Sequence, residues 1–153
     1  MFSIKDIIDI AIQIERNGES VFRDAIKTIS NPSLVSRLQW LADQEVDHAK
    51  WFEKLKQTVV ADINDPTLEK MGRALLRDAI GVQNFALKDA DFSDMNRLED
   101  LLTLAIEFEK DTVLFYTMLR SFIEDQETLD QLDAIIAEEN RHAQLLQEFI
   151  DGN

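Results

Sequence analysis

The sequence contains no cysteine, and this absence excludes several classes of function at once. Without thiolates the chain cannot form a disulfide, a cysteine nucleophile, a zinc ribbon or a cysteine-held iron–sulfur cluster. Basic residues are also scarce: 16 Lys and Arg stand against 30 Asp and Glu, for a formal net charge of -14. A chain of this charge repels phosphate backbones, so we expect no nucleic-acid partner.

Glycine, proline and long apolar runs are few. Four glycines and two prolines leave little room for the tight turns of a β protein. No apolar run approaches the roughly 18 residues of a membrane span, and the opening stretch has acidic residues within its apolar positions. We therefore expect no membrane association and a cytoplasmic location. The 153 residues fit a single domain, 1–153, with a sizeable core.

What the sequence does contain is apolar residues at steps of three and four, a spacing typical of amphipathic helices. The pattern predicts helices over residues 3–29 and 32–60, with Asn31 as the N-cap before Pro32. A second helix pair is predicted within 94–150, divided by an acidic turn at Glu124 and Asp125. The connection 62–93 is predicted to hold one extra helix. Short loops within each pair require antiparallel neighbours, so the predicted fold is an all-α antiparallel four-helix bundle with a long crossover.

The two helix pairs form an internal repeat with an offset of 94 residues. Residues 11–15 align with 105–109, residues 45–49 align with 139–143, and Phe22 aligns with Tyr116. The second pair is therefore a divergent copy of the first. The two copies carry the same residue type at several ionisable positions. A site built from both copies would require this identity.

Those ionisable residues lie on the apolar stripes of the predicted helices. They are Glu15, Glu45, His48, Glu109, Glu139 and His142. No lysine or arginine shares these stripes, and burying unpaired charges costs several kcal/mol each, which argues against a core of ordinary ion pairs. Two divalent cations would neutralise four glutamates. Each of the two histidines follows a glutamate by three residues, so both side chains of a pair can reach one metal ion.

This pattern resembles the ferritin-like di-iron carboxylate proteins, and within them the rubrerythrin-like branch. In that ligand set two helices each give a Glu and the other two each give a Glu-x-x-His. The resemblance implies two iron ions per chain, with manganese as the alternative. Glu15 and Glu109 would be terminal ligands, Glu45 and Glu139 would bridge the metals, and His48 and His142 would each hold one metal.

The sequence departs from its relatives at three points. These 153 residues contain no cysteine with which to form the rubredoxin domain of rubrerythrins proper, so we expect electrons to come from a separate donor protein such as a rubredoxin. Thr112 stands where rubrerythrins carry an extra glutamate, and Val46 stands where bacterioferritins carry a haem-binding methionine. The resemblance also implies a homodimer or a larger homo-oligomer.

The function predicted from these features is a non-haem di-iron oxidoreductase that reduces peroxide or dioxygen. Three alternatives remain: ferritin-like ferroxidase and iron storage, a di-iron hydroxylase, and a helical module in which the metal only stabilises the fold. Tyr116, two turns after Glu109 on the same face, is the candidate catalytic residue. Its hydroxyl has two interpretations, ordinary core packing and a role beside the metals. Glu107 is expected on the solvated face.

Overall fold

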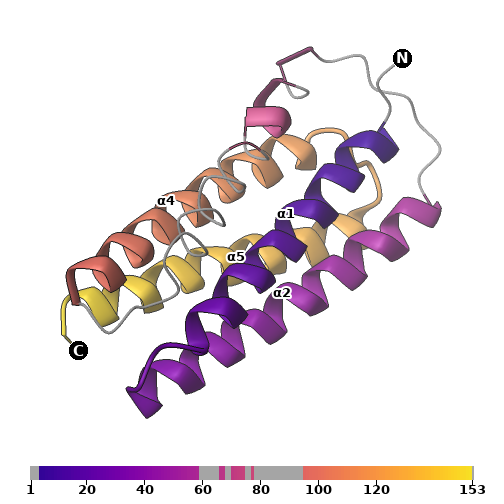
Figure 1. The fold of residues 1–153 in the computed structure, drawn as a ribbon. Helices are drawn as coiled ribbons and strands as arrows, with labels where there is room; N and C mark the ends of the chain where they lie inside the picture. The colour runs from indigo at the N-terminus through magenta and orange to yellow at the C-terminus, as the bar shows by residue number, and fades with distance from the viewer. Residues whose placement is uncertain (1–3, 59–65, 68–69, 75–76, 78–94, 153) are drawn as a thin grey trace.

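Four long α-helices make up most of the described chain (Figure 1). The structure is a computed structural model that describes residues 4–58, 66–67, 70–74, 77 and 95–152. The helices are α1 (Ile4–Ile26), α2 (Pro32–Thr58), α4 (Met95–Arg120) and α5 (Gln126–Ile150). The all-α bundle predicted from the sequence is therefore confirmed. No helix within the described ranges is long and apolar enough to cross a membrane.

The helices pack as two antiparallel pairs, α1 with α2 and α4 with α5 (Figure 1). Two caps help to define where the second helix of each pair begins. The Asn31 side chain accepts hydrogen bonds from the backbone N–H groups of Ser33 and Leu34 at 3.0 and 3.3 Å. Asp125 accepts a bond from the Thr128 backbone in the same way. These side chains accept bonds from backbone N–H groups that the first turn of a helix leaves unpaired. They therefore fix the residue at which each short loop ends and the next helix begins.

The first helix ends earlier than the sequence pattern predicts. α1 stops at Ile26, and Lys27 and Thr28 form turns in which their backbone N–H groups bond to Asp24 and Ala25. The predicted end at residue 29 followed the apolar stripe, and Ile29 does pack against the core. An apolar contact made from the loop is indistinguishable in sequence from one made by a helix.

Part of the crossover is helical, as predicted. Residues 66–67, 70–74 and 77 have helical conformation, and the other residues of the predicted 62–93 insert lie outside the described chain. Gly72 is buried, and a Cβ atom built there would meet Ile10 and Phe115 at 3.1 Å. This short segment therefore lies directly against α1 and α4, and a larger residue at position 72 would require the Ile10 or Phe115 side chain to shift.

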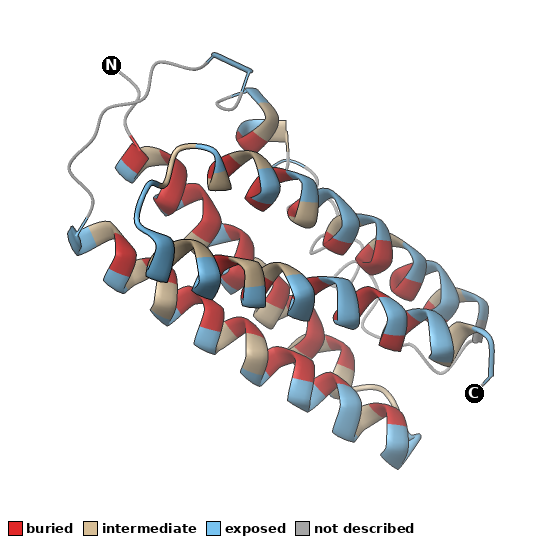
Figure 2. Cartoon of the chain, turned by 180° about the vertical axis from the view of Figure 1, so that it is seen from behind, coloured by how far each residue is buried: buried red, intermediate tan, exposed pale blue. Residues whose placement is uncertain are grey.

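The core consists of two apolar clusters separated by a polar layer. One cluster contains Phe22 and Leu38, and the other contains Ile8 and Phe52. On each long helix, the buried glutamates and histidines lie between these two clusters. Figure 2 shows the buried positions on the faces that the helices turn toward one another. The fold thus encloses a layer of charge-bearing groups between two hydrophobic ends.

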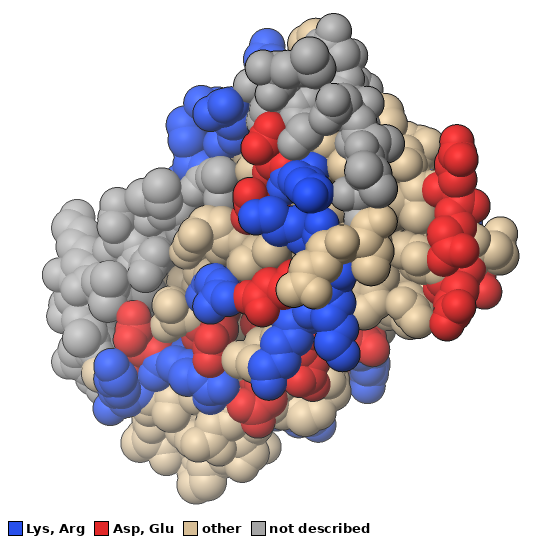
Figure 3. Space-filling model, turned by 90° about the vertical axis from the view of Figure 1, so that its right-hand side faces the viewer, with Lys and Arg blue, Asp and Glu red and all other residues tan. Residues whose placement is uncertain are grey.

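The outer surface of the α1–α2 pair carries ion pairs across the two helices. Arg16 pairs with Glu53, and the Arg23 guanidinium lies 2.9 Å from an Asp43 oxygen. On the face drawn in Figure 3, basic and acidic side chains are interspersed. Exposed pairs of this kind contribute at most about 1 kcal/mol each. The stability of the bundle therefore depends on its interior.

Candidate metal centre

All six ligands predicted from the sequence meet in the polar layer. α1 contributes Glu15, α2 contributes Glu45 and His48, α4 contributes Glu109, and α5 contributes Glu139 and His142. None of the six is more than 3% exposed. Each lies on the buried stripe of an amphipathic helix, so folding the four helices together is enough to assemble the group.

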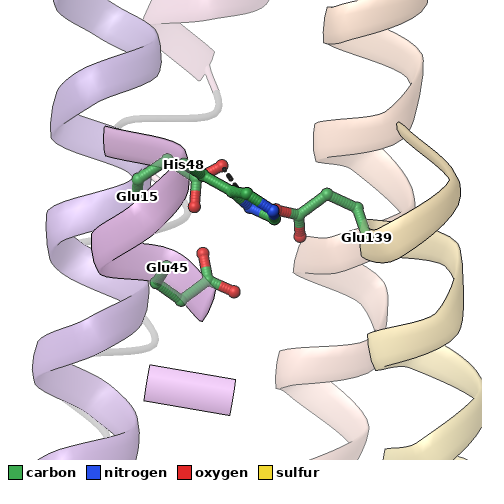
Figure 4. A group of neighbouring side chains, drawn as sticks. All are labelled: Glu15, Glu45, His48 and Glu139. Carbon is green, nitrogen blue, oxygen red and sulfur yellow. Dashed lines mark hydrogen bonds and ion pairs between the residues drawn. The ribbon is translucent and has the colours of Figure 1, made fainter. Parts of the chain in front are cut away.

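The six side chains form two overlapping groups, each compact enough to hold a metal ion. The first is Glu15, Glu45, His48 and Glu139, and the second is Glu45, Glu109, Glu139 and His142. Within each group one donor atom per residue lies within 4.8 Å of every other. Figure 4 shows the first group, with side chains from different helices pointing toward a common centre. Glu45 and Glu139 belong to both groups, which is the placement that bridging ligands require.

The two imidazoles lie near each other and contact the shared carboxylates. His48 Nδ1 is 2.7 Å from Glu139 Oε1, and His142 Nδ1 is 3.1 Å from Glu45 Oε1. The ring centroids are 5.9 Å apart with an interplanar angle of 17°. Each histidine of one helix pair therefore contacts a shared glutamate of the other pair. These contacts link the two halves of the bundle through the site.

The carboxylates differ in their affinity for a proton. Burial raises the pKa of Glu15, and it raises the pKa values of Glu45 and Glu109 well above their usual range, with the negative charge of Glu139 adding to all three shifts. Burial would also raise the pKa of Glu139, but its interactions with Glu109, His142 and His48 hold that pKa well below its usual range. Without metal, negative charge therefore concentrates on Glu139, one of the two shared glutamates.

The histidines shift in the direction that complements this charge. Burial lowers the pKa of an imidazole, but hydrogen bonds to Glu139 and Glu15 outweigh it and raise the pKa of His48 to about 12. Burial also lowers the pKa of His142, but the nearby carboxylates of Glu109 and Glu139 outweigh it and raise this pKa to about 10. In the metal-free protein both rings are therefore protonated at neutral pH.

Several donor atoms have no hydrogen-bond partner, and this tests whether a metal fits. Among the described residues, the buried side-chain atoms that make no hydrogen bond are Glu15 Oε2, Glu45 Oε1, Glu139 Oε2 and both ring nitrogens of His142. His142 Nδ1 and Glu45 Oε1 are close enough for an ion pair but form no hydrogen bond with each other. A buried polar atom left unpaired costs about 1–3 kcal/mol. All of these atoms belong to the two groups, so metal coordination would satisfy them together. The donor set and its unpaired atoms fit a bimetallic centre.

One residue beside the site was not predicted from the sequence. Glu138 Oε2 lies 2.5 Å from His48 Nε2, although the Glu138 side chain is 46% exposed. A carboxylate on the outer nitrogen of a ligating histidine fixes the ring and its tautomer. Glu138 lies off the apolar stripe and 90 residues from His48, so periodicity could not identify it. The repeat gives no signal either, because its equivalent position, 44, is Gln and not a carboxylate.

Tyr116 lies against the site from the α4 side. It is fully buried, and its hydroxyl donates a 2.7 Å hydrogen bond to Glu15 Oε1. Burial and the nearby Glu15 carboxylate raise the pKa of Tyr116 well above its usual value, so the phenol stays neutral. The hydroxyl thus has a hydrogen-bond partner within the core, and that partner is a predicted metal ligand.

Two other positions behave as their side chains suggest. Thr112 is buried, and its hydroxyl donates to the Phe108 carbonyl oxygen one turn earlier at 2.8 Å. This position therefore presents no carboxylate to the site. Glu107 is exposed on the outer face of α4, as the sequence pattern indicates. Neither residue adds to the set of six.

Metal binding should release protons. A histidine ligates only as the neutral ring, whereas His48 and His142 are protonated at neutral pH in the free protein. Addition of a divalent ion in weak buffer should acidify the solution, and the apparent affinity should increase from about pH 6 to pH 8. Indicator-dye titration measures the release. A His142→Ala variant should release fewer protons per bound ion, and binding of metal without any release would contradict the assignment.

Replacing a shared glutamate should remove the pair of ions. After loading with ferrous ion and desalting, we expect about two ions per chain in the wild type and fewer in Glu45→Ala or Glu139→Ala. Glu107→Ala is the matched control, because this side chain is exposed and two residues from Glu109. Metal analysis gives the stoichiometry. Loss of metal from Glu107→Ala, or retention of both ions by Glu45→Ala, would show that the ligand set is wrong.

The comparisons with known proteins agree with this geometry. The family model described as Rubrerythrin matches residues 6–150, a span that includes every one of the six buried donors. No curated protein and no solved structure matches the chain. The matched span covers nearly all of the sequence, and the bundle with its buried Glu and His clusters has the arrangement expected of such a protein. The chain therefore belongs to the rubrerythrin family.

Proposed function

We propose that the protein is a non-haem di-iron oxidoreductase, with manganese as the alternative metal, that reduces peroxide or dioxygen. The observation that carries the proposal is the pair of overlapping donor groups that share Glu45 and Glu139. Four carboxylates and two imidazoles form a mixed oxygen and nitrogen set, which suits iron or manganese better than calcium or magnesium. Membership of the rubrerythrin family supports the same class of chemistry.

The metals would supply the electrons, and the protein would hold and enclose them. When bound, two ferrous ions supply the two electrons that, with two protons, convert hydrogen peroxide to two molecules of water. Glu45 and Glu139 would span both ions, and the apolar clusters on either side keep bulk water away from them. A carboxylate can bind a metal through one oxygen or through two. The ligands could therefore adjust when the charge of the metals changes.

Two neighbouring residues would set the geometry of the ligands. Glu138 occupies the outer nitrogen of His48, so Nδ1 of this ring faces the centre and is the nitrogen available to a metal. Tyr116 donates to one oxygen of Glu15 and leaves the other oxygen free. Since Tyr116 touches a predicted ligand, we propose it as a positioning residue for Glu15.

The oxidised centre would need electrons from outside the chain. The sequence has no cysteine with which to hold an iron–sulfur or rubredoxin centre of its own. We therefore propose a separate electron-donor protein, such as a rubredoxin, as the partner. A homodimer or larger homo-oligomer is also part of the proposal.

The reaction with peroxide tests the proposed function. In stopped-flow mixing, the ferrous-loaded protein should be oxidised by hydrogen peroxide faster than free ferrous ion at the same concentration, because the two electrons are delivered from adjacent ions. Glu139→Ala is the control, since it should lose the paired site while keeping the surface unchanged. Oxidation no faster than that of free ferrous ion would contradict peroxide reduction. Uptake of many more than two ions per chain would favour the iron-storage alternative.

A further inference from the structure

Each of the two buried histidines has a neighbour at the surface, where α2 and α5 contact each other. Glu138 of α5 lies against the outer nitrogen of His48, with Oε2 2.5 Å from Nε2. Trp40 of α2 lies edge-on to His142, with the ring centroids 5.8 Å apart. Both neighbours are partly open to solvent, the Glu138 side chain by 46% and Trp40 by 44%. The buried polar layer therefore comes close to the surface at these two points.

A metal ion needs a polar route into this layer. The six donor residues are buried, and an apolar cluster lies on either side of them. A divalent cation carries bound water, which protein oxygen and nitrogen atoms must replace when the ion is taken up. A path lined by hydrocarbon would remove that water without replacing it, at a large cost in free energy. We therefore expect ions to enter where a ligand atom is exposed.

The side of the layer near His142 offers an ion no such atom among the described contacts. The indole nitrogen of Trp40 carries a hydrogen and acts only as a donor, so it has no lone pair for a cation. A small space also lies between α1 and α4 beside Glu109, with a volume of about 10 Å³. This is room for about one water molecule and too little for a hydrated ion. Neither approach is suited to the passage of a metal ion.

The side near His48 offers a continuous series of ligand atoms. Glu138 Oε2 lies 2.5 Å from one ring nitrogen of His48, and the other ring nitrogen lies 2.7 Å from Glu139 Oε1. Glu139 belongs to both donor groups. Carboxylate and imidazole are both ligands for divalent iron and manganese. An ion held by Glu138 can therefore exchange its waters for protein ligands stepwise, from the surface to a shared glutamate.

The internal repeat does not provide a second series of this kind. The repeat counterpart of Glu138 is Gln44, and the counterpart of Trp40 is Ala134. One histidine therefore has a carboxylate as its surface neighbour, whereas the other has an indole. The buried donors match between the two copies, so this difference lies in the residues that cover the donors.

From these contacts we infer that Glu138 is the entry ligand of the metal centre, which captures a divalent ion at the surface and passes it to His48 and Glu139. The inference rests on the bimetallic centre of the proposed function and not on the reaction with peroxide. It gives Glu138 a role while the centre is being filled, in addition to fixing the His48 ring afterwards. Ions would then reach the position at His142 by way of the position at His48.

The rate at which Co²⁺ associates with the metal-free, full-length protein tests this role. Binding is followed in stopped flow by the visible absorption of the bound ion, so the measurement involves no redox chemistry. In Glu138→Gln the association rate constant should fall about 10-fold, because the variant loses the charge that attracts the cation. The amide oxygen of Gln can still accept a bond from His48, so about two ions per chain should bind at equilibrium.

Dissociation distinguishes an entry route from a positioning role. When excess chelator removes the bound Co²⁺, Glu138→Gln should release it more slowly than the wild type, because an ion leaves by the route through which it enters. A residue that only holds the His48 ring would behave differently, since its loss would speed dissociation and leave association unchanged. That result would overturn the inference.

Glu107→Gln is the matched control, because it removes one exposed carboxylate that lies two residues from Glu109. Both rate constants of this variant should equal those of the wild type. Equal slowing of association in Glu107→Gln and Glu138→Gln would assign the effect to the overall surface charge and would overturn the inference. Association as fast in Glu138→Gln as in the wild type would also overturn it.

The cobalt measurements fail or succeed independently of the reaction with peroxide. If Co²⁺ association depends on Glu138 while peroxide oxidises the ferrous protein no faster than free ferrous ion, the proposed reaction fails and the entry route stands. If Glu138→Gln takes up Co²⁺ at the wild-type rate while peroxide reacts as proposed, the entry route fails and the reaction stands.

Discussion

The structure depends on the burial of four carboxylates and two imidazoles in one layer of a helical bundle. Each of these groups would cost several kcal/mol if it were buried with its charge unpaired. In the metal-free protein this cost is reduced by the way protons are distributed. The imidazoles are protonated and Glu139 is ionised, whereas Glu45 and Glu109 favour the neutral form. Two metal ions would replace those protons. The bundle is thus built around a charge balance that metal can complete.

The internal repeat gives the two metal positions a common plan, and its departures from symmetry give them different surroundings. On one side Glu138 holds His48, and Tyr116 holds Glu15. On the other side His142 has no hydrogen-bond partner on either ring nitrogen. The two positions thus share a set of ligands and differ in the residues that hold those ligands in place.

Much of the fold and the set of six residues could be predicted from the sequence, for a physical reason. Helical periodicity places a residue on a face, and the repeat shows which ionisable residues share that face in both halves. Glu15 and Glu109 were identified in this way, and the bundle then brings them to the same layer. Agreement between two copies of one motif is stronger evidence than either copy alone.

The remaining features depend on contacts between faces, which periodicity does not report. Glu138 lies off the apolar stripe of its own helix and meets a histidine of another helix. Trp40 is 44% exposed and has its ring edge-on to His142, with the centroids 5.8 Å apart. Such features require the relative positions of helices, which only the folded chain defines.

The most direct test of the central claim is a crystal structure of the iron-loaded protein with anomalous diffraction measured at the iron edge. We predict two anomalous peaks per chain in the polar layer. One should lie between Glu15 and His48 and the other between Glu109 and His142, with Glu45 and Glu139 contacting both. A single peak in this layer, or iron bound only by exposed carboxylates, would contradict the claim that the buried glutamates and histidines form a bimetallic centre.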